Sequence, residues 1–140
     1  MTNERLREIL VKVLDEMKEK AVNMKIKGVA VGSVTNHDEN NDWIGEMKVV
    51  DTPVNYAEGW NLIAIAWSKC GEAIATKADS GNPDHRKLTG ECGFVGGTYE
   101  EHDGYKLAFA FSGATSEDDL EVAKFGLERM KLEIAEAENA

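Results

Sequence analysis

Hydrophobic residues near the N-terminus recur every three or four positions, the spacing of one buried face on an α-helix. This pattern predicts a helix over about residues 2–23. Its apolar face is Leu6, Ile9, Leu10, Val13, Leu14, Met17, Ala21 and Met24. Residues 25–34 are small and β-branched and predict a strand. Turn formers at 36–42 and a second apolar segment at 43–50 then predict a β-hairpin.

Helical spacing returns after Pro53 and predicts a central helix over about residues 56–78. Its apolar face is Trp60, Ile63, Ala64, Trp67, Gly71 and Ile74. Two tryptophans on one helical face are more typical of a core than of a stacking platform for a ligand. Gly71 is expected to allow a neighbouring element to approach closely.

The next segments alternate between polar and apolar character. Residues 79–86 predict a polar loop, 87–95 a third strand, 96–104 a glycine-rich connection and 105–111 a fourth strand. In the fourth strand bulky side chains alternate with alanines at 108 and 110, so one face is expected to be buried and the other small. A helix or another subunit is expected on the small face.

The final segment predicts a long helix. Thr115 or Ser116 is placed to cap it, and acidic residues follow at its positive end. The resulting order is helix, hairpin, helix, hairpin, helix. This order predicts an α+β fold with an antiparallel sheet flanked by helices, as one domain over residues 1–140.

Composition and charge narrow the possible partners. The 140 residues are 42% hydrophobic, enough for one globular core. The net charge is −10, divided as −2 over residues 1–70 and −8 over 71–140. This field would repel nucleic acid and an anionic membrane surface, so neither is an expected partner. The N-terminus lacks the apolar core of a signal peptide, and a cytoplasmic location is expected.

The terminal helices differ in charge. Residues 4–27 carry seven bases and five acids, and residues 117–140 carry three bases and eight acids. The two helices are therefore expected to lie side by side or to meet across a subunit contact. This contrast and the small sheet face together predict a homo-oligomer.

Cys70 and Cys92 have neither a disulfide-framework nor a zinc-ligand spacing. Both are expected to be reduced and buried. Cys92 adjoins the glycine-rich segment, yet no basic neighbour in sequence would lower its pKa. An inert thiol is therefore favoured over a redox-active one.

An ordered set of motifs in the last third of the chain carries a family resemblance. It consists of Val95-Gly96-Gly97-Thr98, Asp103-Gly104, the stretch from Phe111-Ser112-Gly113-Ala114-Thr115 to Asp119, and Glu121 to Leu127. This set resembles the terminal signature of the GlcG/HbpS-like family, which includes the C-terminal domain of PduO proteins. Asp51, Ile65-Ala66 and Lys69 extend the resemblance. It implies a profilin-like sandwich, haem binding and homo-oligomers.

The resemblance implies a pocket between the glycine turn, the central helix and the second strand. The residues expected to bind the ligand are Gly96, Gly97, Thr98, Asp51, Lys69 and Arg86. Haem iron needs an axial donor. His85 is the candidate because it adjoins the cations Arg86 and Lys87. His37 and His102 are expected to be solvated turn residues, and residues 100–103 a solvated hairpin tip rather than a metal site.

The sequence thus predicts a protein that binds haem, a related tetrapyrrole or another small ligand. The alternative is an oligomeric accessory module that has lost haem and recognises another small molecule or a protein partner. Thr98, Glu100 and Glu72 motivate this alternative, because they depart from the family pattern near the pocket. No catalytic set is recognisable in the sequence, and haem degradation is implied by the resemblance only.

Overall fold

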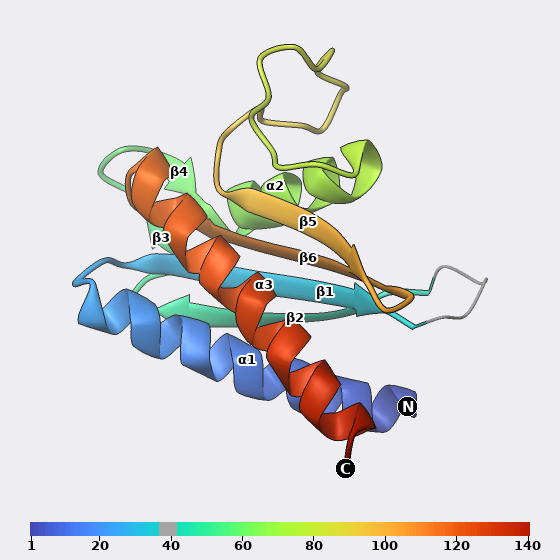
Figure 1. The fold of residues 1–140 in the computed structure, drawn as a ribbon. Coiled ribbons are helices and arrows are strands. Elements are labelled where there is room, and N and C mark those ends of the chain that lie inside the picture. The colour runs from blue at the N-terminus through green and yellow to red at the C-terminus, as the bar shows by residue number, and fades with distance from the viewer. Residues whose placement is uncertain (37–41) are drawn as a thin grey trace.

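The computed structural model describes residues 1–36 and 42–140. In these residues the elements are α1 Asn3–Asn23, β1 Gly28–Thr35, β2 Ile44–Val50, β3 Val54–Asn55, β4 Trp60–Asn61, α2 Leu62–Thr76, β5 Gly97–His102, β6 Tyr105–Ser112 and α3 Ser116–Glu138. A four-stranded sheet and a small two-stranded sheet combine with three helices, which confirms the predicted α+β fold (Figure 1). No helix in the described ranges is long and apolar enough to cross a bilayer.

The main sheet is antiparallel, with strand order β2-β1-β6-β5. In the centre, Val31 of β1 lies opposite Met47 of β2 on one side and Ala110 of β6 on the other. The predicted hairpin of the first two strands is confirmed. Its turn, expected at residues 36–42, falls largely outside the described residues.

One face of the sheet is covered by α1 and α3 (Figure 1). The bulky side of β6, Leu107, Phe109 and Phe111, is fully buried there. Gly126 of α3 lies against α1 so closely that an added Cβ would be 2.4 Å from Met17 Sδ. The absence of a side chain at Gly126 therefore sets the distance between the two helices.

Ion pairs join α1 to α3 above this core. Lys12 Nζ is 2.9 Å from Glu133 Oε1, and Arg129 Nε is 2.8 Å from Glu16 Oε2. The opposite charges of the two helices are thus paired within one chain, as the side-by-side alternative predicted.

The small face of the sheet is covered by α2. Ala108 and Ala110 of β6 are fully buried there, in one cluster with Ala66 and Cys70 of α2. A helix of the same chain therefore fills the place for which a helix or another subunit was expected. Two features suggested a homo-oligomer: the small face of the sheet and the opposite charges of the terminal helices. Both are explained by contacts within the chain. Homo-oligomerisation stays a prediction, to be checked by sedimentation velocity.

The prediction that the central helix begins near residue 56 was wrong. Residues 54–61 form the β3–β4 hairpin, and the Asn61 side chain caps α2 by accepting a hydrogen bond from the Ala64 N–H at 3.0 Å. Trp60 therefore precedes the helix and is 43% exposed, whereas Trp67 packs against the α2 side of the sheet. Gly71 is exposed, and nothing lies within 4 Å of an added Cβ, so no element approaches it closely.

The strand predicted at residues 87–95 was also wrong. This segment is irregular, and β5 instead spans Gly97–His102, within the predicted glycine-rich connection. Isolated hydrogen bonds tie the loop to its surroundings: the Ser68 hydroxyl donates to Gly90 O at 2.9 Å, and the Ser80 hydroxyl to Phe94 O at 2.7 Å. β5 is an edge strand, where polar side chains are tolerated. Because its sequence includes two glutamates, it lacks the apolar alternation by which a strand is predicted.

Candidate functional site

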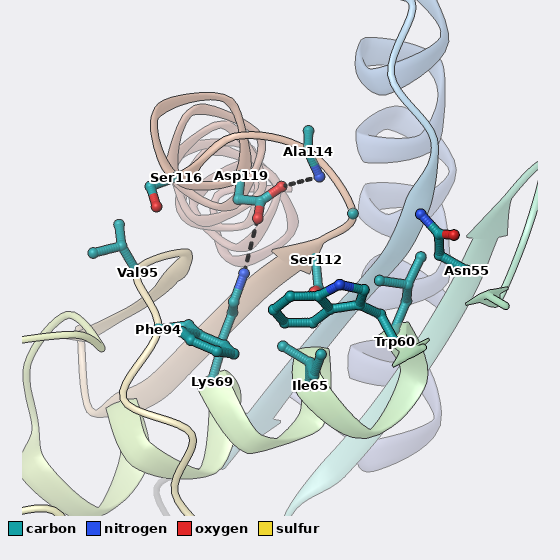
Figure 2. Close-up of a pocket in the computed structure, with 12 residues that line it drawn as sticks. Asn55, Trp60, Ile65, Lys69, Phe94, Val95, Ser112, Ala114, Ser116 and Asp119 are labelled. Atoms are coloured by element: carbon teal, nitrogen blue, oxygen red, sulfur yellow. Dashed lines mark hydrogen bonds and ion pairs between the residues drawn. The ribbon is translucent and has the colours of Figure 1, made fainter. Parts of the chain in front are cut away.

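An open cavity of about 340 Å³ lies where α2, the β3–β4 hairpin, the end of the loop before β5 and the β6–α3 turn meet (Figure 2). This volume is within the range of roughly 300–1,000 Å³ that is typical of small-molecule sites. The cavity is lined by Asn55, Trp60, Leu62, Ile65, Lys69, Phe94, Val95, Ser112, Gly113, Ala114, Ser116 and Asp119. These residues come from distant parts of the chain.

Two aromatic rings form one wall of the cavity. The ring centroids of Trp60 and Phe94 are 5.7 Å apart, and the ring planes are inclined at 50°. Both side chains remain partly exposed, at 43% and 41%. Leu62 and Ile65 of α2 continue this apolar wall. Such a wall offers apolar and aromatic surface to a ligand.

A buried ion pair forms the inner end of the cavity. Lys69 Nζ donates to Asp119 Oδ2 at 2.9 Å and to Phe111 O at 2.9 Å. The side chains of Lys69 and Asp119 are 3% and 5% exposed. The other carboxylate oxygen, Oδ1, accepts a hydrogen bond from the Ala114 N–H at 2.9 Å (Figure 2). The pair therefore fixes the β6–α3 turn against α2.

Burial acts on both members of this pair. It lowers the pKa of Lys69 and raises the pKa of Asp119, because each charged form loses water. The attraction between the two charges opposes both shifts. The ammonium and the carboxylate thus depend on one another to remain charged.

The turn formed by Gly96 and Gly97 packs against the ion pair. Gly96 has a φ of +132°, and an added Cβ would be 2.7 Å from Lys69 Nζ and 2.8 Å from Phe111 O. A Cβ on Gly97 would be 2.6 Å from Lys69 O. The two glycines therefore let the start of β5 pack against α2. Thr98 is buried, and its hydroxyl donates to Asp79 Oδ1 at 2.8 Å.

Of the residues predicted to bind a ligand, Lys69 lines the cavity, and Gly96 contacts Lys69 from behind. Asp51 lies elsewhere, with Oδ2 2.8 Å from Lys27 Nζ, and Arg86 is exposed in the loop before β5. The predicted pocket included the second strand. In the structure the β3–β4 hairpin and the β6–α3 turn take that place.

The predicted metal ligand, His85, also lies away from the cavity lining. Its Nε2 is 2.9 Å from Glu91 Oε1, which anchors the ring to its own loop. His102 Nε2 is 3.4 Å from Asp103 Oδ2 at the β5–β6 turn. His37 lies outside the described residues. Within residues 1–36 and 42–140, no group of three or more His, Cys, Asp or Glu side chains is placed to hold a metal ion.

Sequence reasoning missed several lining residues, among them Trp60, Phe94, Ser112 and Asp119. Ser112 and Asp119 belong to the motif that opens the last helix, but acidic residues there were interpreted as favourable charges at a helix N-terminus. The buried partner of Asp119 is fifty positions away in sequence. Trp60 was interpreted as a core residue because of the misplaced helix start.

The fit of this cavity to haem is incomplete. The apolar wall suits a macrocycle, but the described lining contains no His, Met, Cys or Tyr side chain that would coordinate iron. The Lys69 amine is already held by Asp119 and by a backbone carbonyl. The residues present therefore do not supply the axial donor that haem requires.

The fold, unlike the sequence, has known counterparts. No family model and no curated protein matches the sequence. The structure is similar to that of Klebsiella pneumoniae protein ORFY of the family DUF336, with a TM-score of 0.61 and 15% identity over 92% of this chain and 90% of that one. It is equally similar to the PduOC:Heme complex, with a TM-score of 0.61 and 15% identity over 92% and 94% of the two chains. These likenesses establish a shared fold.

Proposed function

We propose that this chain binds a small organic molecule with a flat, apolar body in the cavity between α2 and the β6–α3 turn. The observation that carries the proposal is the partly exposed Trp60–Phe94 wall, which faces a cavity whose inner end is a buried ion pair. Exposed aromatic rings beside a few fixed polar groups are typical of ligand sites. Because the lining lacks an iron ligand, the proposed ligand is held by packing and hydrogen bonds.

Haem is the second candidate. It is favoured by the likeness to the PduOC:Heme complex, whose fold this chain shares. In this case the macrocycle would lie against Trp60 and Phe94, and the iron donor would come from outside the described lining. His85 is the predicted donor, and binding there would require its bond to Glu91 to break.

Native mass spectrometry of the protein as purified tests the first proposal. We expect a retained small molecule, or added mass when the protein is incubated with a library of flat aromatic compounds. Retention should fall in Trp60→Ala and Phe94→Ala but not in Leu132→Ala, which removes an exposed apolar side chain of α3 outside the cavity lining. Equal retention by all three variants would contradict the proposal.

Titration with hemin tests the second candidate. A Soret band that shifts on binding and changes in His85→Ala would support haem coordination by His85. A shift unchanged by that substitution would exclude His85 as the donor. The absence of any spectral change at micromolar protein would rule out haem and leave the first proposal in place.

A further inference from the structure

The polar groups that face the cavity are mainly hydrogen-bond donors. A lysine ammonium has three N–H groups, and Lys69 uses two of them, for Phe111 O and Asp119 Oδ2. One N–H remains. Asn55 Oδ1 accepts from the Glu58 N–H at 3.1 Å, so its NH₂ group is the part left for a ligand.

The one carboxylate of the lining is already engaged. Asp119 Oδ1 accepts from the Ala114 N–H and Oδ2 from Lys69 Nζ, each at 2.9 Å. These contacts hold both oxygens in place, and the Asp119 side chain is 5% exposed, so little of it is open to a donor group of a ligand. An acceptor group of a ligand can bond to the N–H groups that Lys69 and Asn55 have left.

Ser112 offers a second polar group to a ligand. It is 4% exposed and lines the cavity, and its hydroxyl has no hydrogen-bond partner in the described residues. Ser116 follows at the first helical position of α3, where backbone N–H groups lack helical acceptors. Hydroxyl and N–H groups of this kind hold carboxylates well.

We propose that the ligand of this cavity is an aromatic carboxylic acid. Its ring lies against Trp60 and Phe94, and its carboxylate accepts hydrogen bonds from Lys69, Ser112 and the start of α3. This inference rests on the proposed function, because it requires that the cavity binds a small molecule.

Two lysines lie near the cavity entrance in spite of the net charge of −10. A second cavity adjoins the first and shares with it the lining residues Asn55, Leu62, Gly113 and Ala114. Lys25, Lys27 and Asp118 line it. Lys27 is paired with Asp51, whereas Lys25 has no ion-pair partner within residues 1–36 and 42–140. The Lys25 charge therefore offsets that of Asp118 near the cavity entrance.

Three compounds with the same ring separate the possible ligand types. Isothermal titration calorimetry is carried out with 2-naphthoate, the neutral 2-naphthamide and the cationic 2-naphthylmethylammonium. We expect 2-naphthoate to bind most tightly and the cation most weakly. Equal affinities, or tightest binding of the cation, would overturn the carboxylate inference.

Ser112→Ala locates the carboxylate. It should weaken 2-naphthoate binding about tenfold, as expected for loss of a hydrogen bond to a charged group, and leave the cation unaffected. Thr89→Ala, in the exposed loop before β5, is the matched control and should bind all three as the parent does. Unchanged 2-naphthoate affinity in both Ser112→Ala and Ser116→Ala would place the acid elsewhere and overturn the inference.

Failure of all three compounds to bind would also overturn the inference. Native mass spectrometry then decides the proposed function separately. A retained compound that depends on Trp60 would keep the cavity as a ligand site for another chemical class. No retained compound would reject both.

Discussion

Lys69 of α2 and Asp119 of α3 meet at 2.9 Å although their helices cover opposite faces of the sheet. The contact passes the end of β6, where Lys69 also binds Phe111 O. Both side chains are more than nine-tenths buried. The ion pair therefore joins the two helical layers of the fold at the inner end of the cavity.

Lys69→Met should lower the free energy of unfolding by about 3–5 kcal/mol, because it leaves the Asp119 carboxylate buried without its partner. Urea denaturation measures the loss. The double variant Lys69→Met/Asp119→Asn should recover part of it, since asparagine still accepts from the Ala114 N–H. Lys27→Met, which breaks the exposed pair with Asp51, should change stability little. Equal losses in Lys69→Met and Lys27→Met would contradict the role assigned to the buried pair.

Gly96→Ala should destabilise the protein more than Gly90→Ala. Both glycines have positive φ values, +132° and +99°, so each substitution costs backbone strain. Only at Gly96 does the added Cβ also clash, with Lys69 Nζ and Phe111 O, whereas nothing lies within 4 Å at Gly90. Thermal denaturation of the two variants gives the difference, and a larger loss in Gly90→Ala would refute the close approach at the glycine turn.

Gly71→Ala should raise the free energy of unfolding by about 0.5–1 kcal/mol, because glycine is a poor helix former in a helix interior. Gly71 is exposed in the middle of α2, and an added Cβ meets no neighbour within 4 Å. Urea denaturation measures the gain. A loss of stability would mean that another element covers this face of α2.

Cys70 should not react with Ellman's reagent in the folded protein at pH 7. It is 1% exposed, and burial raises the pKa of its thiol to about 11. Cys92 is half-buried, so it should account for the native reaction. Cys92→Ser should abolish the native signal, and urea should expose the second thiol of the parent chain. Rapid labelling of Cys70 without urea would show that α2 opens from the sheet.

The Glu133 carboxylate should contribute stability that is lost in acid. Hydrogen bonding and attraction to Lys12 and Arg129 lower its pKa below the usual 4.5, so its contribution is complete above that value and disappears as pH falls through the lowered one. Glu133→Gln should therefore be less stable than the parent at pH 7 and lose less on acidification. Glu136→Gln, on the exposed side of α3, should follow the parent curve.

The sequence predicted those elements whose hydrophobic spacing reports one buried face. α1, α3 and β6 are of this kind. Of the two residues expected to cap α3, Thr115 does so by accepting from the Asp118 N–H at 3.2 Å. The segment between α2 and β6 was harder to predict. Its loop is held by isolated hydrogen bonds, and its strand is polar because it lies at the sheet edge. Neither feature gives a regular spacing of hydrophobic residues in the sequence.

The cavity depends on side chains brought together by the fold. Lys69 was a candidate because of a resemblance, but its partner Asp119 could not be inferred from a charge at a helix N-terminus. Trp60 faces the cavity because a two-strand hairpin, and not a helical turn, precedes α2. Such pairings depend on tertiary contacts that local sequence does not record.

The central position of β1 also constrains how the chain reaches its native state. β1 pairs with β6, so the middle of the sheet forms only after the segment that contains Ala110, the partner of Val31, has been synthesised. When only β1 and β2 have emerged from the ribosome, the edge of β1 that pairs with β6 is still unpaired. Contacts of such long sequence separation slow folding. We therefore expect the sheet to be completed late in synthesis, with the cavity as one of the last parts to form.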